Sequence, residues 1–234
     1  MSGNKENIGE FLRSLELDDD TRYRELSSED TRKLNSALML RMVDDNIKFR
    51  SISNYLRTKY WIPEKRMFVS DITGLVNACG RMGEESTGLG VCFWHEESLA
   101  RARELRKTYL KRIRDGLQKI ENDGVFLKDN LQFFYCDYIG FAGIHAGLGM
   151  EYLLDQGRPT IGLTVKDKNT KVSTRGTQWL IGKGLNLAEA CRMAADDIGG
   201  YGGGHPIAAG ATIPKGKEDA FLEKMDDIIG NQMS

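Results

Sequence analysis

The chain has 234 residues, of which 40% are hydrophobic and 29% are charged. Such a composition is ordinary for a soluble globular protein, and the length suffices for one large domain or two small ones. Lys and Arg number 33 against 34 Asp and Glu, a balance that argues against non-specific coating of nucleic acid but permits a local basic cleft. The four cysteines form no C-x-x-C pair, and no apolar run approaches the roughly 18 residues of a membrane span. We therefore expect a reduced, cytoplasmic protein without a membrane partner.

The N-terminal part of the chain predicts helices. Ser27 followed by Asp30 is the pattern of a capping box, and apolar residues then recur at helical intervals. The expected helices cover about residues 8–15 and 28–44, the region around residues 52–56, and a stretch that Ser70 caps. We assign residues 1–95 to a helical segment that also holds a junction between two lobes.

Residues 96–121 predict one long amphipathic helix. Its apolar stripe runs from Leu99 to Ile120, and eight Lys or Arg stand against five acids on the other positions. This small excess of positive charge does not indicate a nucleic-acid groove. We expect a linker helix whose charged face is solvated.

After the linker helix the hydrophobic period changes. Strand-like runs alternate with helical ones, which indicates an α/β (α+β) domain with a mixed sheet over residues 122–234. The expected strands are residues 132–138, 160–165, 171–177 and 211–213, and the expected helices are residues 144–156, 186–197 and 218–230.

A glycine-rich stretch near the C-terminus is the most unusual part of the chain. Five of the six residues from 199 to 204 are glycine, and His205 and Pro206 follow. Glycine permits positive φ and lets backbone N–H groups approach an anion, while Pro206 suits the first position of a short helix. We predict an anion-binding loop ahead of a helix. The alternative is a flexible hinge followed by an ordinary turn.

Two further places carry cations at suggestive spacing. Lys171, Ser173 and Arg175 share one face of an expected strand. This face could bind phosphate groups in a row, or it could be the polar outer face of an edge strand. Asn77 and Arg81 are four residues apart near a glycine, an arrangement that suits a phosphate. The alternative is an ordinary helix end that binds no phosphate, in which Gly80 is the C-cap and Arg81 is a surface residue.

The string GGGHPIAAGATIP, preceded by K-V-S-x-R, resembles the DHH-associated domain of DHH-family phosphoesterases. The string Asn-Ala-Cys-Gly-Arg that ends at Arg81 resembles the junction element of RecJ-like exonucleases, and the archaeal-type branch is the most similar. Gly143 to Gly147 also resembles the start of that domain's first helix, and we expect His145 there to be structural or peripheral rather than catalytic. The resemblance implies that a nucleic-acid phosphate is held by Arg175, His205, Gly203, Gly204, Ser173, Gly202, Arg81 and Asn77.

The same resemblance implies a division of labour. In the family, a DHH lobe holds two metal ions, Mn or Mg, and hydrolyses the phosphodiester bond. The paired-aspartate and Asp-His-His strings of that lobe do not occur in this sequence. We therefore expect no metal site and no catalytic residue in these 234 residues, and an inactive chain on its own. The expected role is to bind single-stranded DNA or RNA for an exonuclease of DNA replication and repair whose DHH lobe lies elsewhere.

Three alternatives stay open. Some RecJ relatives have lost the nuclease and bind the GINS complex as scaffolds in the replisome. Other DHH phosphoesterases degrade short oligoribonucleotides or cyclic dinucleotides. The C-terminal domain of alanyl-tRNA synthetases, which binds tRNA, is also similar.

Overall fold

The computed structural model describes residues 5–20, 22–44 and 58–234. The chain divides into two compact units, Met1–Val69 and Ser70–Ser234. The expected helix around residues 52–56 lies outside the described residues. The sequence-based division has its boundaries after residues 95 and 121 and differs from this one, whose boundary lies between residues 69 and 70. It stays a prediction.

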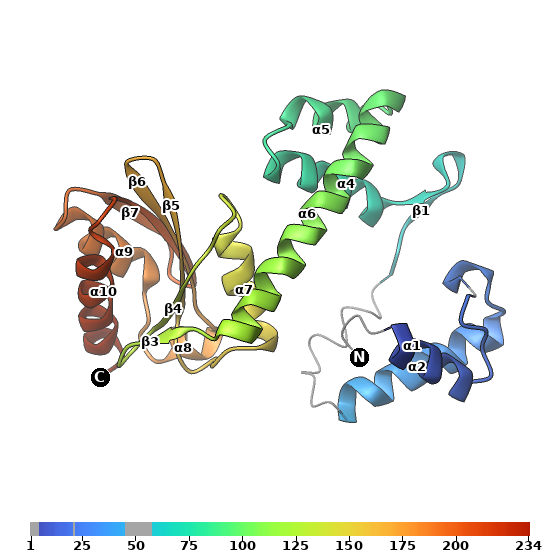
Figure 1. The fold of residues 1–234 in the computed structure, drawn as a ribbon, viewed down its shortest axis with the longest axis horizontal. Coiled ribbons are helices and arrows are strands. Elements are labelled where there is room, and N and C mark those ends of the chain that lie inside the picture. Colours follow the sequence, from blue (N-terminus) through green and yellow to red (C-terminus); the bar gives the residue numbers. More distant parts are fainter. Residues whose placement is uncertain (1–4, 21, 45–57) are drawn as a thin grey trace. The chain divides into compact units, whose positions relative to one another are not determined.

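The first unit contains short elements, coloured blue to cyan in Figure 1. Helix α2 begins directly after Ser27, whose hydroxyl accepts the backbone N–H of Asp30 at 3.0 Å and so confirms the expected cap. Strands β1 and β2 pair antiparallel. The elements are α1 (Lys5–Ser14), η1 (Tyr23–Glu25), α2 (Ser28–Asp44), β1 (Trp61–Ile62), η2 (Pro63–Lys65) and β2 (Met67–Phe68).

Three helices open the second unit: α4 (Val69–Arg81), α5 (Glu85–Cys92) and α6 (Glu96–Asp123). The expected cap at Ser70 is wrong, because Ser70 is the second residue of α4. Gly80 is likewise inside α4, and Gly83, with φ of 76°, follows the helix instead. Helix α5 was not expected, since its glycines and short length weaken the helical pattern.

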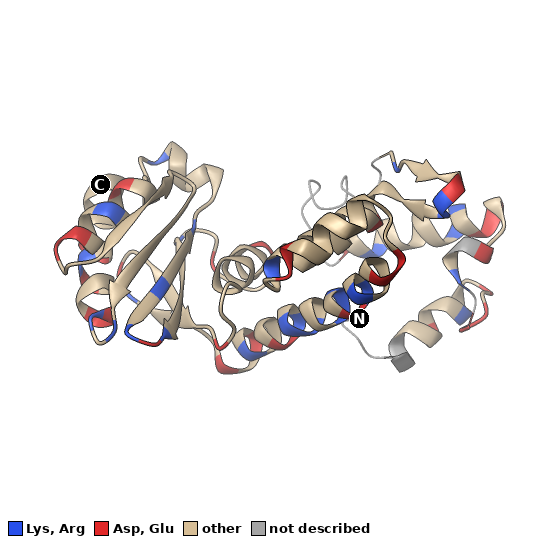
Figure 2. Cartoon of the chain, turned by 90° about the horizontal axis from the view of Figure 1, so that it is seen from above, with Lys and Arg blue, Asp and Glu red and all other residues tan. Residues whose placement is uncertain are grey.

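The linker helix α6 is confirmed and runs two residues beyond the expected end. Its buried side chains lie on the expected stripe, among them Leu105, Tyr109 and Ile120. Figure 2 shows both signs of charge distributed along it, and Lys107 and Lys119 form ion pairs with Glu104 and Asp137. This agrees with a solvated charged face.

A mixed sheet of six strands forms the centre of the C-terminal part, in the order β3-β4-β5-β6-β8-β7. Strands β4 and β5 are parallel and every other pair is antiparallel. The expected α/β fold with a mixed sheet is therefore confirmed. The strands are β3 (Phe126–Leu127), β4 (Gln132–Tyr135), β5 (Thr160–Lys166), β6 (Asn169–Arg175), β7 (Tyr201–His205) and β8 (Ala208–Pro214).

Helices cover both faces of this sheet (Figure 1). Helix α7 packs on one face, where Phe134, Ala142 and Ala146 form a core with α6. Helices α9 and α10 pack on the other face over a larger core that includes Ile161 and Ile213. The two faces are called the α7 face and the α9 face below. The helices are α7 (Ala142–Tyr152), α8 (Gln178–Gly182), α9 (Leu187–Asp196) and α10 (Glu218–Met233), of which α8 was not expected.

The glycine-rich stretch is a strand, and the expected loop followed by a helix is wrong. Residues Tyr201–His205 form β7, which pairs with β8, and Pro206 and Ile207 make the turn of a hairpin. The glycines serve close packing: a Cβ on Gly202 would lie 2.4 Å from the carbonyl oxygen of Cys191 on α9. Sheet pairing satisfies backbone groups that a free loop would have left for a ligand or for water.

No helix in the described part of the chain combines the length and the apolar character needed to cross a membrane.

Candidate phosphate-binding site

Three neighbouring strands, β6, β8 and β7, place the predicted residues in rows on the α7 face. Residues directly opposite each other in antiparallel strands point to the same face, and every second residue of a strand does the same. The register therefore gives three rows, which are Lys171–Thr212–Tyr201, Ser173–Gly210–Gly203 and Arg175–Ala208–His205. In the middle row only Ser173 has a side chain, because the other two residues are glycines. We call these two residues, Gly210 and Gly203, the glycine floor.

Arg175 is the half-buried cation of this face. One of its nitrogens, Nη1, donates to its neighbour's carbonyl, that of Thr174, at 2.8 Å. Its guanidinium lies against Gly143 of α7, where a Cβ would stand 2.8 Å from Nη2. Burial, and secondarily the positive charge of Arg81, lower the pKa of Arg175. Among the residues that the structure describes, no Asp or Glu forms an ion pair with Arg175, so its charge is available to an anion.

His205 is exposed at the end of β7. It pairs with Ala208, which pairs with Arg175, so these two predicted site residues belong to one row. Two strand spacings separate the Cα atoms of Arg175 and His205, which are thus about 10 Å apart. An imidazole and a guanidinium at this separation can both reach a phosphate group that lies between them.

The three predicted glycines do not act alike. Gly203 belongs to the glycine floor, and a Cβ there would meet nothing within 4 Å. Gly202 points to α9, and Gly204, with φ of 142°, is held against Ala209, so neither opens onto the α7 face. Only Gly203 exposes bare backbone beside Arg175 and His205.

Asn77 and Arg81 lie one turn apart on α4, inside the helix rather than in the expected turn. Asn77 Nδ2 is 3.5 Å from the hydroxyl of Tyr109, a contact that ties α4 to α6. Arg81 is exposed, and its charge is close enough to Arg175 to lower the pKa of that residue. The structure thus brings Arg81 toward the row of Arg175, whereas it gives Asn77 a contact within the helical part.

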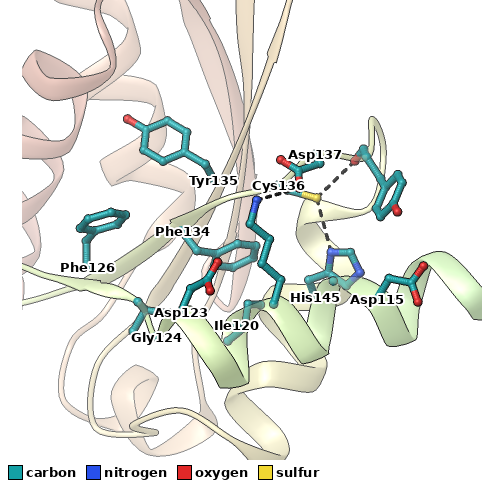
Figure 3. A pocket seen from close by; sticks show the side chains of 14 residues that line it. Asp115, Ile120, Asp123, Gly124, Phe126, Phe134, Tyr135, Cys136, Asp137 and His145 are labelled. Carbon is teal, nitrogen blue, oxygen red and sulfur yellow. Dashed lines mark hydrogen bonds and ion pairs between the residues drawn. The ribbon is translucent and has the colours of Figure 1, made fainter.

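A separate pocket of about 320 Å³ lies between α6, β4 and α7 (Figure 3). Cys136 Sγ is 3.4 Å from His145 Nδ1 and 3.3 Å from the carbonyl oxygen of Tyr138. His145 Nε2 faces the carbonyl oxygen of Arg112 at 3.1 Å and therefore donates its proton there. Figure 3 shows this pair at the pocket wall.

The Cys136–His145 pair is neutral. Burial raises the pKa of the Cys136 thiol and lowers the pKa of His145, so both effects oppose a thiolate with an imidazolium. The pair therefore lacks the activation that a nucleophilic cysteine requires. His145 also packs against Gly116 of α6, where a Cβ would be 2.2 Å from the ring, and these contacts suit a structural residue.

Metal ligands do not gather in the described ranges, residues 5–20, 22–44 and 58–234: there, no three His, Cys, Asp or Glu are grouped to hold a metal ion. The Mn or Mg of the sequence-based expectation is assigned to a separate lobe, and that assignment stays a prediction.

The sequence-based site did not include Tyr201, the aromatic member of the rows. Its signal was present, because Tyr201, Gly203 and His205 alternate with period two like the side chains of a strand. The glycines obscured it by suggesting a loop.

Comparisons with known proteins agree with this fold. Residues 136–231 match the DHHA1 domain family. An uncharacterized protein of Methanocaldococcus jannaschii is 30% identical over 223 residues, which are 95% of this chain and 47% of that protein. The chain thus spans about half the length of the curated relative that it matches.

Two solved structures are similar over large parts of the chain. RecJ of Thermus thermophilus, in complex with Mn²⁺, has a TM-score of 0.55 and 20% identity, covering 68% of this chain and 24% of RecJ. CDC45 of Entamoeba histolytica has a TM-score of 0.57 and 8% identity, covering 97% of this chain and 50% of CDC45. At these identities the likeness concerns the fold.

Proposed function

We propose that this chain holds single-stranded nucleic acid for a DHH phosphoesterase. Two findings support the proposal: residues 136–231 match the DHHA1 domain family, and the fold resembles part of RecJ. The observation that carries the proposal is the row of Arg175, Ala208 and His205, which joins two phosphate-binding side chains beside the glycine floor. Single-stranded DNA and RNA share the phosphate that this row would bind.

The charge arrangement supports an anionic ligand. Removing a guanidinium from water costs free energy unless an anion or hydrogen-bond acceptors take the place of the solvent. Arg175 is half-buried with one backbone acceptor, and the nearby charge of Arg81 adds repulsion. A phosphate at this position offsets both effects through charge-assisted hydrogen bonds.

The role of the chain in the reaction is positioning. Arg175 and His205 hold the phosphate and the glycine floor lets the backbone of the nucleic acid approach closely. In the proposal, the neighbouring phosphodiester bond is hydrolysed at a DHH lobe, where Mn or Mg supplies the activated water. No residue of this chain takes part in the bond cleavage.

Fluorescence anisotropy with a labelled single-stranded oligonucleotide tests the proposal. We expect Arg175→Ala and His205→Ala each to weaken binding about tenfold or more, the size of a lost hydrogen bond to a charged group. Arg192→Ala is the matched control, because Arg192 is an exposed arginine of α9, beyond the other face of the sheet. Wild-type affinity in both folded site variants would overturn the proposal.

A second candidate function is the GINS-binding scaffold. The fold likeness to CDC45 extends over 97% of this chain, including the first unit, and favours a role for residues outside the DHHA1 domain. A scaffold retains GINS in a pull-down after Arg175→Ala and His205→Ala, and its affinity for single strands is unchanged by them.

The length of the preferred substrate separates the exonuclease from the small-nucleotide enzymes. We expect affinity to rise with the length of the single strand. A preference for the shortest oligonucleotides would assign the chain to the oligoribonucleotide or cyclic-dinucleotide phosphodiesterases instead.

A further inference from the structure

The row Lys171–Thr212–Tyr201 lies on the same face as the row of Arg175, with the glycine floor between them. Lys171 and Arg175 are four residues apart on β6, so the two rows are about 13 Å apart along the strands. The proposed phosphate contacts do not involve Tyr201.

Tyr201 presents an aromatic ring to solvent. It is 67% exposed. Strand β7 is an edge strand of the sheet, so Tyr201 has a neighbouring strand on one side only.

Two neighbours in the row lie close to this ring. Lys171 Nζ donates to Thr212 Oγ1 at 2.8 Å and lies 5.9 Å from the centre of the Tyr201 ring. A hydrogen bond with Thr212, followed by the charge of Lys171, lowers the pKa of the Tyr201 hydroxyl. The Lys171 ammonium therefore lies near the ring, and the ring stays exposed.

We propose that Tyr201 is a stacking platform for a nucleobase of the strand whose phosphate Arg175 and His205 hold. The inference rests on the proposed function and extends it from the phosphate to the base. A tyrosine side chain has only two torsions, so its ring loses little conformational freedom when a flat ligand stacks on it.

The layout of the face fits a nucleotide better than an isolated phosphate. A cationic row, a floor without side chains and an aromatic row follow one another along the strands. Proteins that bind single strands without sequence preference combine a cationic track with aromatic rings in this way. Lys171 sits beside the ring and adds a positive charge near the following phosphate.

The test compares two single-stranded probes of equal length, one with bases and one abasic. We expect Tyr201→Ala to weaken binding of the base-containing probe about tenfold, the usual size of a lost base stack. Binding of the abasic probe is expected to be unchanged, because that probe has no base to stack. Tyr201→Phe keeps the ring and is expected to retain most of the affinity.

Two controls separate this inference from the proposed function. Arg175→Ala removes a phosphate contact and is expected to weaken binding of both probes. Tyr135→Ala removes an exposed tyrosine on the α9 face and is expected to change neither. If Arg175→Ala acts on both probes but Tyr201→Ala acts on neither, or on both equally, the stacking role is wrong and the phosphate site stands. If Arg175→Ala acts on neither probe, the proposed function itself is wrong.

Discussion

Arg175 and His145 are both withdrawn from solvent, and burial is the main cause that lowers the pKa of each. The outcome differs because a guanidinium stays charged at any physiological pH, whereas an imidazole loses its proton. Burial therefore makes Arg175 a cation that an anion stabilises, and it makes His145 a neutral hydrogen-bonding group. The same physical effect thus separates Arg175, the proposed binding residue, from His145.

We predict a pH dependence of stability that His145 causes. The folded state resists protonating this buried ring, while the unfolded chain binds the proton below the ordinary histidine pKa of about 6.5. Below that value the unfolded state binds more protons than the folded state, so the free energy of unfolding falls as the pH falls. Above that value the neutral His145 causes no such loss. His145→Gln keeps a donor for the Arg112 carbonyl and does not titrate.

Urea denaturation on either side of that pKa measures this effect. His145→Gln is expected to lower stability somewhat at neutral pH and to reduce the loss on acidification. A pH dependence as steep as that of the wild type would mean that other groups cause it.

At the scale of elements, the hairpin of β7 and β8 has two faces with opposite demands. On the α9 face, β7 approaches the backbone of α9 so closely that Gly202 has no room for a side chain. On the α7 face, Gly203 has open space above it. Two adjacent glycines therefore differ: Gly202 has no room for a side chain, and Gly203 borders the open space that the proposed ligand would use.

The same substitution at these two glycines is expected to give opposite results. Gly202→Ala places a Cβ 2.4 Å from the Cys191 carbonyl oxygen and is expected to destabilise the protein by about 1–3 kcal/mol. Gly203→Ala meets nothing within 4 Å and is expected to leave stability unchanged while weakening oligonucleotide binding. Urea denaturation and fluorescence anisotropy on both variants check the pair. Equal destabilisation by both would show that the α7 face is not open at Gly203.

At the scale of the whole molecule, we expect the positive charge that acts on a nucleic acid to be local, as judged from the residues that the structure describes. The net charge is −1, and cations of α6 such as Lys107 and Lys119 are paired with acids. Binding should therefore depend on a few phosphate contacts near Arg175, Lys171 and Arg81, and not on a general attraction of the surface.

The salt dependence of binding reports that number of contacts. Each phosphate contact with a single strand contributes a slope of about −0.7 to log K against log salt concentration. We expect a shallow slope for the wild type, equivalent to two or three contacts or about −1.4 to −2, and a slope smaller in magnitude by about 0.7 for Arg175→Ala. Anisotropy titrations over a range of KCl concentrations measure both. A steep slope that Arg175→Ala does not change would indicate diffuse binding elsewhere on the molecule.

Most elements could be predicted from the sequence, because local periodicity and capping specify them. Ser27 caps α2, Asn186 caps α9 through its side chain, and the apolar stripe of α6 lies where the spacing put it. The alternation of Lys171, Ser173 and Arg175 on one face is likewise a local property of a strand. What these patterns share is that each depends on residues only a few positions apart.

Only the tertiary structure decided what the glycine-rich stretch is and what it faces. Its glycines read as a loop, but pairing with β8 and contact with α9 make it a strand. The placement of Tyr201 beside Lys171, and of His205 in the row of Arg175, follows from the order of β6, β8 and β7 in the sheet. Strand order and register join residues that are about 30 positions apart, and no local pattern in the sequence encodes that pairing.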